Sequence, residues 1–174
     1  MRPGKFLLLT LLLLLVSASC VASKPPKSLE SEAVAQIYVA AIAEIHTFAR
    51  TRSVVYVLTT TEDLVYDEAP LAPAQELASD LRETIKDELV EERFELVWIE
   101  ALDQAAIDPS NRQIAEGEGI VITLGNIHPQ EDGSVLLSFF MACGDLCGIG
   151  KTFVLNESGN NWHVTGSVGP EIAS

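Results

Sequence analysis

Two segments of the chain place apolar side chains at the spacing of an α-helix. In residues 29–49 the apolar positions recur at every fourth residue, and the segment that starts at Pro73 has the same spacing. Such positions fall on one side of a helix. They are Leu29, Ala33, Ile37, Ala41 and Ile45 in the first segment and Leu77, Leu81, Ile85 and Leu89 in the second. We therefore predict two amphipathic helices, each with one side packed on a sheet.

The remaining regular segments are rich in β-branched and aromatic residues, which favour strands. Residues 53–61 and 94–102 flank the second helix, and this order allows a right-handed parallel crossover. After residue 118 the chain changes to short apolar runs between turns, which predicts an antiparallel meander. These runs are 119–125, 134–142, 151–156 and 161–166. The predicted fold class is α+β, with two helices on one face of a mostly antiparallel sheet, in a single domain over residues 28–174.

The first nineteen residues have the layout of a secretion signal. Arg2 and Lys5 precede a leucine-rich apolar run from Phe6 to Val16, in which Thr10 is the one polar residue, and small residues follow it. A helix of that run spans about 16 Å at 1.5 Å per residue, against roughly 30 Å for the hydrocarbon core of a bilayer. The run is too short for a stable membrane span, so residues 1–19 are predicted to be a signal peptide.

The end of this leader resembles the bacterial lipobox, in which small residues lead into a lipidated cysteine. Residues 16–20 read Val-Ser-Ala-Ser-Cys, although the residue before Ala18 is more often Leu in that motif. Lipidation at Cys20 would attach the protein to a membrane, with residues 20–27 as a short proline-containing tether. The alternative is ordinary cleavage nearby, for example after Ala22, which would discard Cys20.

The other two cysteines, Cys143 and Cys147, lie in a glycine-rich segment. Three residues separate them, so a turn can bring their Cα atoms within disulfide distance, and an exported chain meets an oxidising compartment. A redox pair or half of a metal site are the alternatives, but redox motifs have two intervening residues and structural zinc needs four ligands. We predict a structural disulfide, which leaves Cys20 as the odd cysteine.

The same segment carries a family resemblance. Residues 143–150 read Cys-Gly-Asp-Leu-Cys-Gly-Ile-Gly, and residues 152–155 and 159–164 follow as Thr-Phe-Val-Leu and Gly-Asn-Asn-Trp-His-Val. In these features the chain resembles a group of uncharacterised bacterial exported proteins, often with lipoprotein signals, that share a Cys-Gly-x-Leu-Cys-Gly-x-Gly motif. The resemblance implies export and paired cysteines. It implies no activity and no catalytic residues.

The composition is acidic, with a formal net charge of −14. Such a surface repels nucleic acid, and it is suited to cations or a basic partner. We predict no cofactor and no metal site. The leading hypothesis is a lipid-anchored binding or interaction domain in a bacterial cell envelope, with a protein or envelope partner. The alternative is an envelope enzyme with His128, or the acidic loop after the first strand, in a cleft; a carboxylate from another segment beside His128 would favour it.

Overall fold

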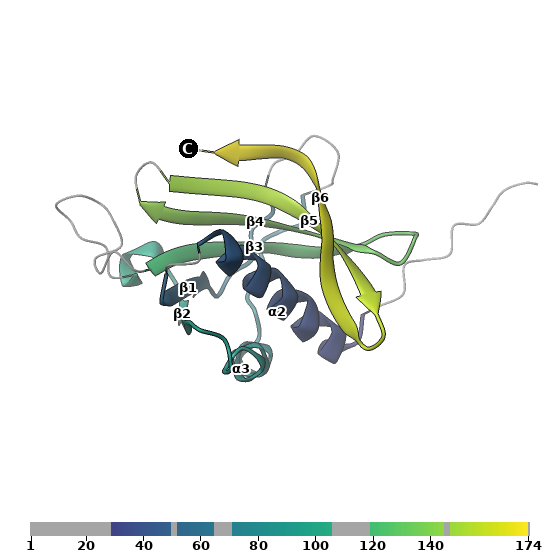
Figure 1. Cartoon of the computed structure of the whole chain (residues 1–174), viewed down its shortest axis with the longest axis horizontal. Helices are drawn as coiled ribbons and strands as arrows, with labels where there is room; N and C mark the ends of the chain where they lie inside the picture. The colour runs from purple at the N-terminus through teal and green to yellow at the C-terminus, as the bar shows by residue number, and fades with distance from the viewer. Residues whose placement is uncertain (1–28, 50–51, 65–70, 106–118, 145–146, 174) are drawn as a thin grey trace, which may run out of the picture.

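The computed structural model describes residues 29–49, 52–64, 71–105, 119–144 and 147–173 (Figure 1). Two helices and a six-stranded sheet form the fold, so the predicted α+β class is confirmed. The helices are α2 (Ser31–Phe48) and α3 (Ser79–Glu88), with a short 3-10 helix η1 (Leu102–Gln104). The strands are β1 (Val54–Leu58), β2 (Glu95–Ile99), β3 (Gly119–Pro129), β4 (Val135–Gly144), β5 (Cys147–Ser158) and β6 (Asn161–Ala173).

The sheet is mixed, and its order is β2-β1-β3-β4-β5-β6. β1 pairs in parallel with β2 on one side and with β3 on the other, and every later pairing is antiparallel. The parallel pair β1–β2 is joined through α3, as the strand–helix–strand order predicted. From β3 onward each strand pairs with the next one in the chain, which is the predicted meander.

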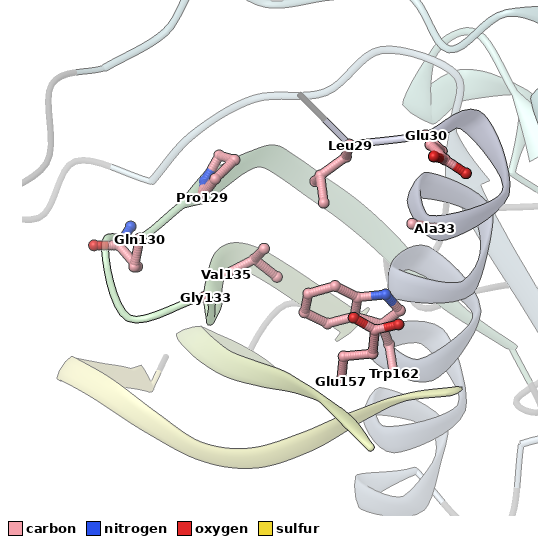
Figure 2. A pocket seen from close by; sticks show the side chains of 9 residues that line it. All are labelled: Leu29, Glu30, Ala33, Pro129, Gln130, Gly133, Val135, Glu157 and Trp162. Atoms are coloured by element: carbon pink, nitrogen blue, oxygen red, sulfur yellow. The ribbon is translucent and has the colours of Figure 1, made fainter. Parts of the chain in front are cut away.

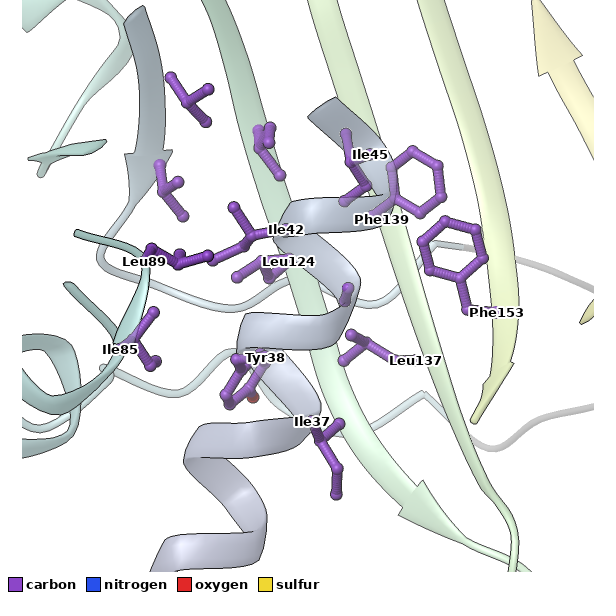
Figure 3. Close-up of a cluster of buried hydrophobic side chains, with 14 of the residues drawn as sticks. Ile37, Tyr38, Ile42, Ile45, Ile85, Leu89, Leu124, Leu137, Phe139 and Phe153 are labelled. Carbon is purple, nitrogen blue, oxygen red and sulfur yellow. The ribbon is translucent and has the colours of Figure 1, made fainter. Parts of the chain in front are cut away.

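The main core lies between α2 and one face of the sheet. Figure 3 shows Ile37, Tyr38, Ile42 and Ile45 of α2 directed toward the strands. These side chains are at most 4 % exposed, and they belong to the same buried cluster as the fully buried Phe139 of β4. The buried residues recur at three- and four-residue intervals, which explains why this segment forms a helix that packs on a sheet. β6 curves past α2 in Figure 1, and the two elements are in contact.

A smaller apolar cluster lies apart from this core. Ile99, Ala105 and Val121 are buried there, with Tyr56 and Val97 packed against them. Tyr56 and Val97 are register partners in the parallel pair β1–β2, so their side chains share one face of the sheet. The parallel half of the sheet therefore buries apolar residues in a second cluster as well.

Three sequence predictions need correction. The second helix begins at Ser79, not at Pro73, because the backbone before it pairs in extended form with the end of β1: Thr61 N donates to Gln75 O and Leu77 N to Thr59 O, each at 2.8 Å. The strands of the meander are longer than predicted. Most of the segment 143–150, predicted as a joint, belongs to β4 and β5, with Gly144 opposite Cys147.

Candidate functional site

A polar cluster occupies the space beyond the end of β1, beside the second half of β3. We call it the Asp63 cluster, and it comprises Thr61, Asp63, Asn126 and His128. The chain leaves β1 toward β2 on one side and leaves β3 toward β4 on the other. In open sheets with parallel strands, ligands often bind where neighbouring connections diverge in this way, so the cluster merits examination as a site.

Asp63 is the centre of the cluster. Its Oδ1 accepts a 2.7 Å hydrogen bond from the backbone N–H of Asn126. Its Oδ2 is 2.9 Å from Nε2 of His128, and it also accepts from Asn126 Nδ2 and Ala72 N, each at 3.1 Å. Thr61 Oγ1 donates to Asn126 Oδ1 at 2.7 Å, which fixes the orientation of the Asn126 amide. Four donors therefore surround one carboxylate.

A β-bulge creates this arrangement. The register between β3 and β4 shifts between Leu124 and Ile127, which leaves Gly125 and Asn126 outside the regular pairing. A Cβ on Gly125 would lie 2.9 Å from Asp63 Oδ1 and would collide with the side chain of Ser138. Glycine is therefore required where the carboxylate approaches the strand. The bulge turns the Asn126 N–H toward Asp63 instead of toward β4.

The environment of Asp63 favours its ionised form. Its side chain is only 6 % exposed, and this burial alone would raise the pKa of the carboxyl. The hydrogen bonds from Asn126, Ala72 and His128 outweigh burial and hold the pKa of Asp63 below its usual value. Burial, with a smaller contribution from the Asp63 charge, raises the pKa of the neighbouring Tyr38 hydroxyl. Asp63 is thus a charged acceptor with its oxygens already occupied, and this makes it a weak proton acceptor for a substrate.

The second candidate site is a cavity of about 230 Å³ at the start of α2, which we call the Trp162 cavity. Figure 2 shows it between the first turn of α2, the β3–β4 hairpin and the β5–β6 hairpin. Its lining residues are Leu29, Glu30, Ala33, Pro129, Gln130, Gly133, Val135, Glu157 and Trp162. Drug-sized ligands occupy roughly 300–1,000 Å³. The cavity is smaller than these ligand sites, so it suits a single amino-acid side chain or a small-molecule fragment of similar size.

Trp162 lines this cavity, and its indole N–H is a hydrogen-bond donor. The residue is 7 % exposed, and no described residue accepts a hydrogen bond from its indole N–H. In Figure 2 the indole nitrogen lies on the side of the ring nearest α2. The other tryptophan, Trp98, donates its N–H to Arg82 O at 3.2 Å. Among the buried side-chain nitrogens and oxygens of the described residues only Arg82 Nε lacks a partner, so the indole N–H of Trp162 is accessible to solvent, where water or a ligand can accept from it.

Two further polar residues outside these sites, His46 and Asp132, have structural roles. His46 Nε2 lies 2.9 Å from Arg52 O, and its ring packs 4.3 Å from that of Phe94. Asp132, in the turn between β3 and β4, accepts from the backbone and hydroxyl of Ser134. Those hydrogen bonds hold the pKa of Asp132 below its usual value.

The predicted cysteine sites are covered only in part. Cys143 is disulfide-bonded. The side chain of Cys147 is outside the described part of the chain, so its pairing with Cys143 stays a prediction. Cys20 and the leader also lie outside the described residues. Within the described ranges, no helix is both long and apolar enough to cross a membrane, and no three His, Cys, Asp or Glu side chains group as metal ligands.

Sequence reasoning connected neither Asp63 with His128 nor Trp162 with a cavity. One local signal was present at the first site: the Gly125-Asn126 pair interrupts an otherwise apolar strand, which is typical of a bulge. Comparisons of the chain with protein-family models, with curated proteins and with solved structures found no match. The geometry of the two sites is therefore the basis for a functional proposal.

Proposed function

We propose that this protein is an exported binding domain, anchored through a lipid on Cys20, whose ligand site is the Trp162 cavity. The leader, the lipobox-like residues 16–20 and the odd cysteine support export and anchoring. The observation that supports binding is the indole N–H of Trp162, which has no acceptor among the described residues, is accessible to solvent and belongs to a residue that lines a partly apolar cavity. A concave apolar site with a few oriented polar groups is the usual form of a ligand site.

The anchoring is tested with Cys20→Ala. The variant should move from the membrane fraction to the soluble or released fraction, because it has no thiol for a lipid to modify. Metabolic labelling with a fatty acid should mark the wild-type chain and leave the variant unmarked. Unchanged membrane association together with absent labelling of both chains would refute the anchor.

Binding at the cavity is tested by a fragment screen on the full chain, purified in detergent. The indole N–H signals of the two tryptophans are followed by NMR. Ligands of the cavity should shift the signal of Trp162 and leave that of Trp98, whose N–H is already bonded within the fold. A screen in which no fragment shifts Trp162 saturably would refute the cavity as a binding site.

An envelope enzyme is the second candidate, because His128 and Asp63 meet at 2.9 Å from segments far apart in the sequence. His128 is 25 % exposed, which permits contact with a substrate. Two features oppose it: Asp63 already accepts four hydrogen bonds, and neither residue lines the Trp162 cavity. Hydrolysis of a chromogenic ester panel that His128→Gln abolishes without a loss of stability would support the enzyme. Equal hydrolysis by the wild type and the His128→Gln variant, or no hydrolysis by either, would reject the enzyme hypothesis.

A further inference from the structure

We infer that the Trp162 cavity takes the basic side chain, lysine or arginine, of a peptide ligand. This inference rests on the proposed binding function and specifies its ligand class. Three properties of the cavity carry it: the charge of its polar residues, the apolar surface beside them, and the free donor on Trp162.

The first property is negative charge at an apolar site. Glu30 and Glu157 line the cavity, and no Lys or Arg is among the described residues that line it. The start of α2 contributes the partial positive charge of a helix N-terminus, equivalent to about half an elementary charge. Two full negative charges exceed this, and Glu32 in the first turn adds a third nearby. The field in the cavity therefore favours a cation.

The second property is a surface that fits the aliphatic part of a long basic side chain. Leu29, Val135 and the ring of Trp162 provide apolar contacts in the cavity. Lysine and arginine bury their methylene stems against such surfaces while the charged group stays near water. Glu157 and Trp162 are register partners on neighbouring strands, so their side chains leave the same face side by side. A cation there meets a carboxylate and an aromatic ring together.

The third property separates a peptide from a simple amine. The N–H of Trp162 has no acceptor among the described residues, and an ammonium or guanidinium group cannot supply one. A peptide supplies both groups, because its backbone carbonyl accepts a hydrogen bond and its side chain carries the cation. The net charge of −14 adds long-range attraction for a basic segment.

The test uses the full chain in detergent and the indole signals described above. The probes are three blocked tripeptides, Gly-Lys-Gly, Gly-Arg-Gly and Gly-norleucine-Gly; the last keeps an apolar stem and lacks the charge. The basic peptides should shift Trp162 saturably and leave Trp98 unchanged. Added salt should weaken the binding of the basic peptides, because it screens the attraction between partly exposed charges. Glu157→Gln should weaken basic-peptide binding about two- to fivefold, the range for an exposed ion pair.

A matched control and the contrary outcomes make the test decisive. Glu92→Gln removes one exposed carboxylate that does not line the cavity, and it should leave basic-peptide binding unchanged. Equal binding of the norleucine peptide would overturn the cation inference while the cavity remains a binding site. If none of the three peptides binds but the fragment screen gives hits at Trp162, the cation inference is likewise overturned and the cavity remains a binding site. Failure of the peptides and of the screen would overturn both proposals.

Discussion

Replacing Asp63 by alanine should destabilise the protein by about 2–4 kcal/mol. The substitution leaves four donors without their acceptor: two on Asn126, one on Ala72 and one on His128. Asn126 is only 6 % exposed, so water cannot readily replace the carboxylate there. A buried donor left unpaired costs about 1–3 kcal/mol. Two such donors account for the expected loss, and the donors of Ala72 and the partly exposed His128 add little.

Equilibrium unfolding in urea measures this loss. The midpoint concentration should fall while the slope with denaturant stays constant, since the surface exposed on unfolding is nearly unchanged. His128→Ala is the matched comparison, because it removes one donor whose side chain is 25 % exposed and leaves the other three hydrogen bonds. It should cost less than about 1 kcal/mol. A loss below about 1 kcal/mol for Asp63→Ala would refute the view that this carboxylate holds the loop to β3.

The stability of wild type and that of the Asp63→Ala variant should depend differently on pH. Because the folded-state pKa of Asp63 lies below its ordinary value of 3.8, the unfolded chain binds the proton first as the solution is acidified. The stabilisation by the carboxylate is complete at pH values above that ordinary value. It is lost as the pH falls through the lower folded-state pKa. Wild type should therefore lose stability more steeply than Asp63→Ala below pH 3.8; parallel curves would contradict the hydrogen-bonded carboxylate.

The remaining predictions concern two buried positions. Gly125→Ala should unfold the bulge or destabilise the domain by at least about 2 kcal/mol, because the new methyl group meets Ser138 and Asp63 in a packed site; Gly166→Ala, where a Cβ has open space, is its control in the same urea experiment. Phe139→Ala should cost about 3–5 kcal/mol, since the ring is fully buried and packs 4.6 Å from that of Phe153. A cost under about 1 kcal/mol at either position would contradict the packing described here.

The apolar periodicity was sufficient to predict the fold class, because burial of one face dictates the spacing of apolar residues. Ile37, Ala41 and Ile45 are buried as predicted. The start of α3 was mispredicted because proline is favoured in a first helical turn, whereas pairing of residues 75–77 with the end of β1 decides the local backbone. That pairing is a contact between two segments of the chain, and it does not show in the spacing of apolar residues within either segment.

The candidate sites were harder to predict for the same reason. Asp63 and His128 are separated by 65 positions, and only the register of β3 beside β1 brings them together. Trp162 is largely buried, as a tryptophan in a strand usually is. The cavity beside it is formed by residues of α2 and of two separate hairpins. No local sequence motif indicates that these three segments come together.

The position of Leu29 connects the two parts of the proposed function. Leu29 lines the Trp162 cavity, and Cys20 precedes it by nine positions. A chain of that length spans at most about 30 Å when fully extended. If Cys20 bears the lipid, the cavity stays within about 30 Å of the bilayer surface, whatever the orientation of the domain. Where the leaflet that holds the lipid carries anionic headgroups, they would repel the acidic domain and concentrate basic peptides in the same layer. The anchor would thus bring the cavity to the place where its proposed ligands accumulate, and lengthening the tether with a Gly-Ser insertion should weaken capture of a membrane-bound basic peptide without changing binding of the free tripeptide.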